Sequence, residues 1–433
     1  MNAKLEPTPM PASLWAASAV AGREYPVLRG AQRTRVAIVG GGFTGLSAAL
    51  HLAERGVEVT LLEAQSIGWG ASGRNGGQVI PGLKHDPDTL IKRYGRERGQ
   101  ALIDTTGRNA DVVFELIERL GIECDATRHG WIQPALDGAS LRVTQGRARQ
   151  WQEHGVPVTL LDRQEVSEQL GSSAYIGGWI DPRAGGLNPL SYCRGLAKAA
   201  DHAGARLCEY SPVEQLQRQP DGWKLKLATG GEVIADQVLV CTNGYSGDLW
   251  PRLRQSVIAA NSFQIATRPL SDAEGASVIP GNQVVSDARK LLLYYRRDSQ
   301  GRLLMGGRGP FHDPQGPNDF THLRRAIAQV YPALADVDIE YRWHGRVALT
   351  RDAMPHVHQP APGLTIALGY NGRGVGMATH LGKLLGERLG SEDNDWQLPF
   401  SLSPIRPIPL HFLQKVYVGT VVNYYRLRDR LHI

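Results

Sequence analysis

The stretch that decides the fold runs from Arg35 to Glu63 and has the sequence RVAIVGGGFTGLSAALHLAERGVEVTLLE. Its apolar, β-branched start predicts a buried parallel strand, and the residues after Gly45 have helical periodicity up to a stop at Gly56. A second strand, 57–62, is expected before the final acid. This order of strand, glycine-rich turn, helix and strand predicts an α/β fold that begins with a Rossmann-type nucleotide-binding unit.

The glycines at 40–45 fit the pattern G-x-G-x-x-G. We expect Gly40 to permit the tight turn, Gly42 to let the backbone approach a pyrophosphate, and Gly45 to let the helix pack on the strand. Thr44 lies inside the same motif. Glu63 stands 18 residues after Gly45, where an acid accepts hydrogen bonds from an adenosine ribose. A dinucleotide site is therefore predicted at the end of the first strand.

The next segment favours one dinucleotide. Residues 66–78, SIGWGASGRNGGQ, form a long glycine-rich loop directly after Glu63, whereas an NAD domain normally continues into another helix. Glycine lets the backbone crowd against an extended cofactor, so the loop favours FAD. The structural alternative is a mobile surface loop, and the functional alternative is an NAD-linked enzyme.

Together, the motif at 40–45, Glu63 and the run ASGRNGG at 71–77 resemble the D-amino-acid oxidase superfamily of flavoenzymes. Within it, the chain is most similar to the branch of γ-glutamylputrescine oxidoreductase and bacterial L-pipecolate oxidase, from residue 14 to residue 431. The flavin-linked cysteine that sarcosine oxidases carry near 290–296 is missing, which implies non-covalent FAD. The resemblance places these further residues at the cofactor: Ala71, Ser72, Arg74, Asn75, Gly76, Gly77, Val213, Asn371, Gly372, Arg373 and Gly374.

The pattern along the rest of the chain predicts a composite α/β and α+β architecture. The FAD-binding domain is expected to be discontinuous and to comprise residues 30–83, 181–249 and 346–398. An inserted substrate domain with an antiparallel sheet is expected from residues 84–180 and 250–345, with paired strands at 290–296 and 302–307. Residues 399–433 form a C-terminal tail.

Composition excludes several classes of protein. A net charge of +6 from 48 basic and 42 acidic residues is too small and diffuse to indicate a nucleic-acid partner. The four cysteines have no CxxC spacing, so we expect buried thiols and no metal site. No secretory signal and no apolar run of membrane-spanning length is visible, and a cytoplasmic location is the expectation.

Three residues are candidates for contact with the substrate. Arg346 matches an arginine that clamps the substrate carboxylate in relatives such as glycine oxidase, and a guanidinium suits that task because its planar fork offers two parallel donors. The alternative is a structural pair between Arg346 and Asp352. Tyr294 and Tyr295 are neighbours in an expected strand, so at most one of them can line the pocket.

The last cofactor segment, TIALGYNGRGVGM at 365–377, predicts a strand, a glycine-rich loop and a helix, 377–388. In the superfamily the start of this helix points at the flavin pyrimidine ring, where its dipole stabilises negative charge on N1 and O2 of the reduced flavin. Relatives often have histidine where Arg373 stands. A fixed cation there favours the anionic reduced form if the side chain points inward, and the alternative is a solvated arginine.

The resemblance therefore implies an FAD-dependent enzyme that oxidises the CH–NH bond of an amine or amino acid to an imine, by hydride transfer to flavin N5. No residue stands out as an obligatory base. An α-imino acid such as L-pipecolate, a compound of lysine degradation, is the preferred substrate because Arg346 can serve its carboxylate. The alternatives are γ-glutamylputrescine as the substrate and a flavin-binding scaffold without catalysis.

The tail adds a question about partners. Residues 410–425 are apolar over much of their circumference, and Arg426, Arg428 and Arg430 follow. Such a segment can lie in the interface of an anionic membrane, with electrons passed to a respiratory carrier on the inner face of the cell membrane instead of to oxygen. The alternative is docking against the body of the protein or a second subunit.

Overall fold

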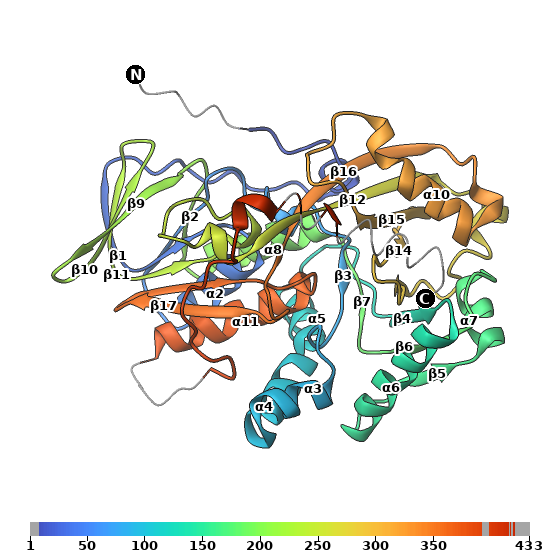
Figure 1. Cartoon of the computed structure of the whole chain (residues 1–433). Coiled ribbons are helices and arrows are strands. Elements are labelled where there is room, and N and C mark those ends of the chain that lie inside the picture. The colour runs from blue at the N-terminus through green and yellow to red at the C-terminus, as the bar shows by residue number, and fades with distance from the viewer. Residues whose placement is uncertain (1–7, 392–397, 415, 417–418, 421–433) are drawn as a thin grey trace.

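The structure is a computed structural model that describes residues 8–391, 398–414, 416 and 419–420 (Figure 1). Two eight-stranded sheets carry the fold, and a two-stranded ribbon of β3 (Gln78–Val79) and β7 (Gly185–Gly186) lies between the segments that build them. The first sheet and its helices lie on the left of Figure 1, and the second sheet lies on the right.

The first sheet is centred on β1 (Ala31–Val39), which pairs in parallel with β2 (Val59–Leu62) on one side and β11 (Glu232–Val240) on the other. All four residues of β2 are buried, as a parallel strand covered on both faces requires. The predicted strand–helix–strand unit is therefore confirmed. The other strands of this sheet are β8 (Arg206–Cys208), β9 (Val213–Gln219), β10 (Gly222–Leu227), β17 (His356–Ala361) and β18 (Leu364–Leu368).

Two helices lie together against this sheet and aim their N-termini at the same region (Figure 1). They are α2 (Phe43–Ala53), which is buried along its whole length, and α11 (Gly374–Gly390). A Cβ on Gly382 of α11 would stand 2.4 Å from the carbonyl oxygen of Thr44, so the glycine permits the close helix contact. The same core includes α8 (Pro189–His202) and residues of α3 (Pro87–Tyr94), α4 (Arg96–Gly107) and α5 (Asn109–Leu120).

The second sheet has the strand order β16-β12-β15-β14-β13-β4-β6-β5 and is antiparallel except for the β13–β4 pair. Its centre is the long strand β12 (Ile258–Pro269), which pairs with β15 (Arg302–Arg308) and β16 (Ile339–Leu349). The predicted strand pair appears as β14 (Tyr294–Arg297) and β15. The remaining elements are β4 (Trp131–Ala135), β5 (Thr159–Leu161), β6 (Gly177–Asp181), β13 (Val284–Ser286), α1 (Leu14–Ser18), α6 (Gly138–Glu153), α7 (Arg163–Leu170), α9 (Asp272–Gly275) and α10 (Thr321–Val330).

The sheets divide the chain in a way that differs in two places from the expected segments. Helices α3 to α5, within 84–180, bury apolar side chains in the core beneath the first sheet. The strand β16 stays in the second sheet through residue 349, beyond the expected border at 345/346. We propose that the domains follow the two sheets, with 84–120 joined to the first, because the apolar faces of these helices pack there.

Candidate active site

A cavity of about 970 Å³ lies between the two sheets. Its walls are the glycine motif after β1, the loop 69–78, one face of the second sheet, and the loop 370–375 before α11. The carboxyl ends of β1, β2 and β11 all open onto it, which is where ligands bind in open parallel sheets.

The glycine motif leaves the start of α2 free for a ligand. Gly42 is the N-cap of this helix and supplies no side-chain hydrogen bond, and the Phe43 N–H is bonded to Ser72 Oγ at 3.0 Å. Gly40 has a φ of +112°, and a Cβ on Gly45 would stand 2.0 Å from the Gly40 carbonyl oxygen. Thr44 also lines the cavity, with its hydroxyl 2.6 Å from the Tyr370 hydroxyl. The turn has the shape and the unpaired N–H groups that a pyrophosphate needs.

Glu63 closes the far end of this turn. Its Oε2 accepts the Gly41 N–H at 2.6 Å, and its Oε1 accepts the Gln65 N–H at 2.9 Å. Burial raises the pKa of the carboxyl, whereas these backbone donors act in the opposite direction. The carboxylate therefore both orders the glycine turn and faces the cavity, as an acid that binds a ribose must. Val213 lines the cavity nearby.

The loop 71–77 is ordered by its own side chains. Asn75 donates from Nδ2 to the carbonyls of Ala71 and Ser72 and accepts the Gly77 N–H at 2.8 Å. A Cβ on Gly77 would stand 2.1 Å from the Leu187 carbonyl oxygen, and one on Gly76 would stand 2.8 Å from the Tyr294 ring. The loop lines the cavity instead of forming a surface loop, although Gly77 itself, like Gly45, acts behind the lining.

Arg74 carries a buried cation along this loop. Its guanidinium lies 4.1 Å from the Trp69 ring centroid, and its Nε donates to the Trp69 carbonyl at 2.6 Å. Its Nη2 is buried and has no hydrogen-bond partner among the described residues. Burial and the nearby Arg346 lower the pKa of Arg74. An anionic ligand in the cavity would relieve both costs.

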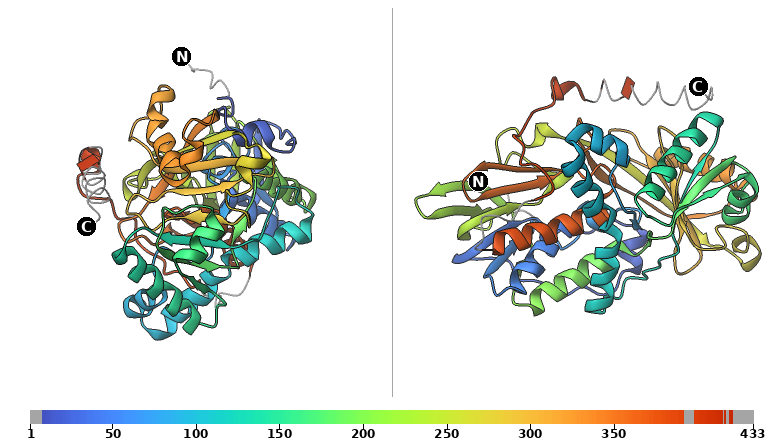
Figure 2. Two further views of the ribbon diagram at one scale, coloured as in Figure 1. Left: turned by 90° about the vertical axis from the view of Figure 1, so that its right-hand side faces the viewer. Right: turned by 90° about the horizontal axis from the view of Figure 1, so that it is seen from below.

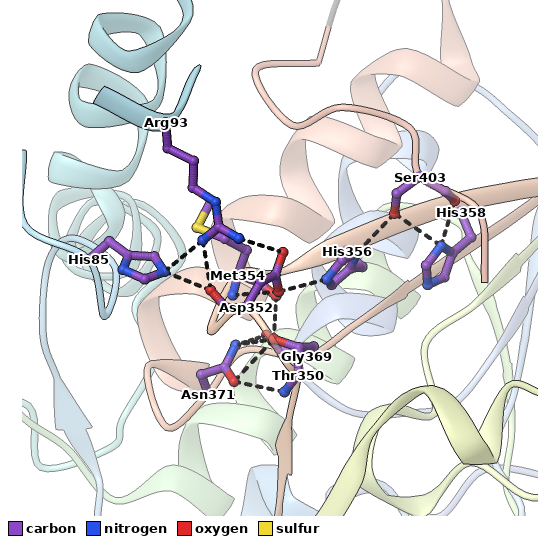
Figure 3. A network of polar contacts seen from close by, with 10 residues as sticks. All are labelled: His85, Arg93, Thr350, Asp352, Met354, His356, His358, Gly369, Asn371 and Ser403. Atoms are coloured by element: carbon purple, nitrogen blue, oxygen red, sulfur yellow. Dashed lines mark hydrogen bonds and ion pairs between the residues drawn. The ribbon is translucent and has the colours of Figure 1, made fainter. Parts of the chain in front are cut away.

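The loop before α11 is fixed by Asn371 and the strand end beside it (Figure 3). Asn371 has a φ of +52°, its Oδ1 accepts the Thr350 N–H at 2.9 Å, and its Nδ2 donates to the Gly369 carbonyl at 2.5 Å. The chain continues to Asp352, which pairs with His356 at 3.0 Å and with Arg93 at 3.6 Å. These contacts hold the loop at the cavity wall.

Arg373 stands directly before α11 and points inward. Its guanidinium lies 4.7 Å from the Trp131 ring centroid, and burial with the nearby Arg147 lowers the pKa of Arg373 to about 10. Gly372 has a φ of +85°, and Gly374 is the first residue of the helix. Because Arg373 lines the cavity, it is placed to act on negative charge near the start of α11.

The structure separates the two candidate tyrosines. Tyr294 lines the cavity, and its hydroxyl lies 2.8 Å from Ser262 Oγ. Tyr295 points to the other face of the sheet, where it is 1% exposed and its hydroxyl lies 3.0 Å from that of Tyr175. The assignment of Tyr295 to the site is corrected accordingly, because successive strand residues face opposite sides.

Arg346 lies at the rim of the cavity and already has a carboxylate partner. Its side chain is 42% exposed, and its Nη2 lies 3.5 Å from an oxygen of Asp313. The alternative pair with Asp352 is wrong, since Asp352 contacts His356 and Arg93 instead. A role for Arg346 at the substrate carboxylate remains a prediction.

Three residues that sequence reasoning missed also line the cavity: Lys84, Gln264 and Arg308. Gln264 donates to the Arg74 carbonyl at 2.5 Å and so joins the second sheet to the loop. Strand alternation offered a signal for Arg308, because it stands two positions after Gly306 and so shares the face of the sheet that Tyr294 covers. Lys84 gave no signal, since it stands in a loop without periodicity.

The fold and the cavity define an oxidoreductase of the dinucleotide-binding flavoprotein class. A model of the FAD dependent oxidoreductase (DAO) family matches residues 35–388, and the chain belongs to this family. FAD is therefore its cofactor, and the glycine turn, Glu63 and the loop 71–77 fit that group.

Three comparisons illustrate the relationship. The γ-glutamylputrescine oxidoreductase of Escherichia coli is 34% identical over 97% of this chain and 99% of its own length. A probable oxidoreductase, OrdL, of Haemophilus influenzae is 32% identical over 94% of both chains. The crystal structure of glycine oxidase from Geobacillus kaustophilus has a TM-score of 0.72 at 24% identity and covers 86% of this chain and 99% of its own, which shows a shared fold.

The cysteines and the helices bear on two other expectations. All four cysteines are buried and free, as predicted, and Cys241 lines the cavity. No group of side chains suited to a metal ion occurs in the described part of the chain. None of the helices within the described ranges is long and apolar enough to cross a membrane.

Proposed function

We propose that this chain oxidises the C–N bond of an amino or imino acid to an imine. The observation that carries the proposal is the set of cations, Lys84, Arg308 and Arg373, that lines the cavity between the loop before α11 and the second sheet. FAD, when bound, supplies the acceptor for the two electrons and the hydrogen of the substrate C–H bond.

The residues of the chain orient the amine and exclude water. Tyr294 covers the sheet face beside Gly306, where a Cβ would stand 2.2 Å from its ring, so the ring has one tightly defined place. Arg373 stabilises negative charge at the start of α11. The amine must lose a proton before its lone pair can assist the loss of the C–H hydrogen, and Lys84 is the cavity group that is suited to accept it.

L-Pipecolate remains the preferred substrate, and γ-glutamylputrescine is the alternative. The E. coli relative named for γ-glutamylputrescine supports the alternative, and its similarity extends over nearly the full length of both chains. Clustered cations favour an amine that brings a carboxylate and no second ammonium group, which supports the imino acid.

Flavin reduction under anaerobic conditions tests the proposal. We expect L-pipecolate, and more weakly L-proline or sarcosine, to bleach the flavin absorbance at pH 8, with γ-glutamylputrescine as the comparison. Bleaching by γ-glutamylputrescine alone would transfer the function to the alternative. A flavin that every carboxylated amine leaves oxidised would contradict the proposal and indicate a scaffold.

We also propose that the C-terminal tail binds an anionic membrane surface. The described part of the tail lies outside the body of the protein in both views of Figure 2. It exposes Leu410, Phe412 and Val416, and Phe412 is 79% exposed. In the sequence, these residues are followed by Arg426, Arg428 and Arg430, which lie outside the described residues. An exposed aromatic next to basic residues is the chemistry of interfacial binding.

Sedimentation with vesicles tests the tail. The holoenzyme should sediment with phosphatidylglycerol vesicles and be released by 0.5 M salt, whereas Phe412→Ser should reduce binding roughly tenfold, because about 2 kcal/mol of apolar burial is lost. Leu402→Ser, another exposed apolar residue, is the matched control. Dimerisation through the tail, or equal recovery without vesicles, would contradict membrane binding. Peroxide formed in amounts equal to substrate would identify oxygen, and not a respiratory carrier, as the electron acceptor.

A further inference from the structure

Arg308 ends the strand β15 with its side chain in the cavity. Its Nη1 is buried and has no hydrogen-bond partner among the described residues. Burial lowers the pKa of Arg308, and the nearest titratable neighbour is the hydroxyl of Tyr294, which is neutral at physiological pH because burial raises its pKa. A buried guanidinium without a partner is costly and indicates a missing anion.

The charges around Arg308 increase this cost. Lys84 and Arg373 line the same cavity, and Arg308 and Arg373 both act to lower the pKa of Lys84. In the part of the chain that the structure describes, no carboxylate forms an ion pair with any of these three cations. The acids nearest to Arg373, Asp86 and Asp181, are already paired with Arg147 and Arg183. The cluster therefore carries an excess of positive charge that only a ligand can balance.

The register of the second sheet places Arg308 beside the tyrosine of the site. Arg308 pairs with Ser262, and Gly306 pairs with both Gln264 and Tyr294. Because side chains of paired strand residues share a face, these groups all face the cavity. Tyr294 reaches across Gly306 to Ser262 Oγ, so its ring forms one side of the space in front of Arg308.

Arg346 has the opposite placement. It pairs with Asn261, whose amide contacts the carbonyl of His312 and the carboxylate of Asp313. Arg346 contacts the same Asp313 and is partly exposed, so its charge is already balanced. Of the two arginines, Arg308 is the one with a free donor in a buried position.

We propose that Arg308 binds the carboxylate of the amine substrate, an inference that rests on the function proposed above and names the residue that selects its substrate class. That class is amines with a carboxylate close to the reacting carbon, taken up as zwitterions or anions. Lys84 lies close enough to pair with the same carboxylate once it holds a proton. Amines without a carboxylate leave Arg308 unpaired and are rejected.

Binding of pyrrole-2-carboxylate, a planar carboxylate that is not an amine substrate, tests the assignment through the visible spectrum of the bound flavin. Arg308→Met should weaken its binding about 100-fold, and Arg308→Lys should weaken it about tenfold, because lysine keeps the charge without the fork. Pyrrole, which lacks the carboxylate, should bind equally poorly to all forms. Free guanidinium should partly restore binding to Arg308→Ala.

Two variants complete the design. Arg302→Met changes an arginine on the same strand that pairs with Glu340, and it should leave binding within about twofold. Arg346→Met is the competitor, and the proposal requires its loss of affinity to be clearly smaller than that of Arg308→Met. A larger loss with Arg346→Met, or unchanged binding in a folded, flavin-loaded Arg308→Met, would overturn the assignment.

The outcome is separable from the fate of the proposed function. If no amine reduces the flavin but pyrrole-2-carboxylate still binds through Arg308, the carboxylate site stands and the proposed oxidation fails. If L-pipecolate reduces the flavin of Arg308→Met with an unchanged KM, the oxidation stands and the carboxylate site is overturned.

Discussion

Replacing Glu63 by glutamine is expected to give a folded chain that is purified almost without FAD. The carboxylate accepts two backbone N–H bonds that order the glycine turn and has its remaining acceptor capacity directed at the cavity. A glutamine keeps the size of the side chain but turns one acceptor into a donor, which then opposes an N–H group. Loss of hydrogen bonds to a charged group predicts that the dissociation constant of FAD rises about 100-fold or more.

This prediction is checked by the ratio of flavin to protein absorbance and by titration of FAD into the apoprotein. Glu214→Gln is the matched control, because Glu214 lines the same cavity but is exposed, and this variant should retain FAD. Circular dichroism separates loss of flavin from loss of fold. A Glu63→Gln protein with the flavin content of the parent would refute the assigned role of the carboxylate.

The second large effect is expected at Lys84. The accessible surface of this side chain faces the cavity, and protein encloses it elsewhere, so that burial and the cations Arg373, Arg147 and Arg308 lower the pKa of Lys84 to about 7. The lysine is therefore protonated below this pH and neutral above it. Only the neutral form can take the proton of a substrate ammonium group, so flavin reduction should accelerate as pH rises through about 7.

Lys84→Met should remove this acceptor. We expect the rate of flavin reduction at pH 7 to fall about 100-fold, the usual scale of a general base, and the rising limb to move toward the higher pKa of the free substrate amine. Stopped-flow reduction between pH 6 and 10 measures both quantities. Lys290→Met, which changes another lysine of the cavity lining, serves as the control. A pH profile identical in Lys84→Met and the parent would rule out this role.

The first part of the fold could be predicted because its signals are local. The strand β1, the turn at Gly40 and Gly45 and the helix α2 are fixed by glycines whose added Cβ atoms would collide with backbone. The pairing of β14 with β15 followed from two apolar runs around a polar turn. Helices α3 to α5 were assigned to the wrong core, since an amphipathic face does not reveal which sheet covers it.

The substrate side of the cavity was harder to predict because its charges come from distant segments. Lys84 and Arg308 lie more than 200 positions apart in the sequence and meet only through the fold. Arg346 was singled out by resemblance, yet its free charge depends on Asp313, which no local pattern indicates. Tyr294 and Tyr295 illustrate the converse, since alternation alone restricted the site to one of them.

The nucleotide released from the purified chain tests the central claim most directly. We predict that acid or heat releases one FAD per chain and leaves no flavin on the protein, although Cys241 lines the cavity. Flavin that stays attached after denaturation would contradict the non-covalent site, and a chain that releases no FAD, or a nicotinamide nucleotide in its place, would contradict the account as a whole.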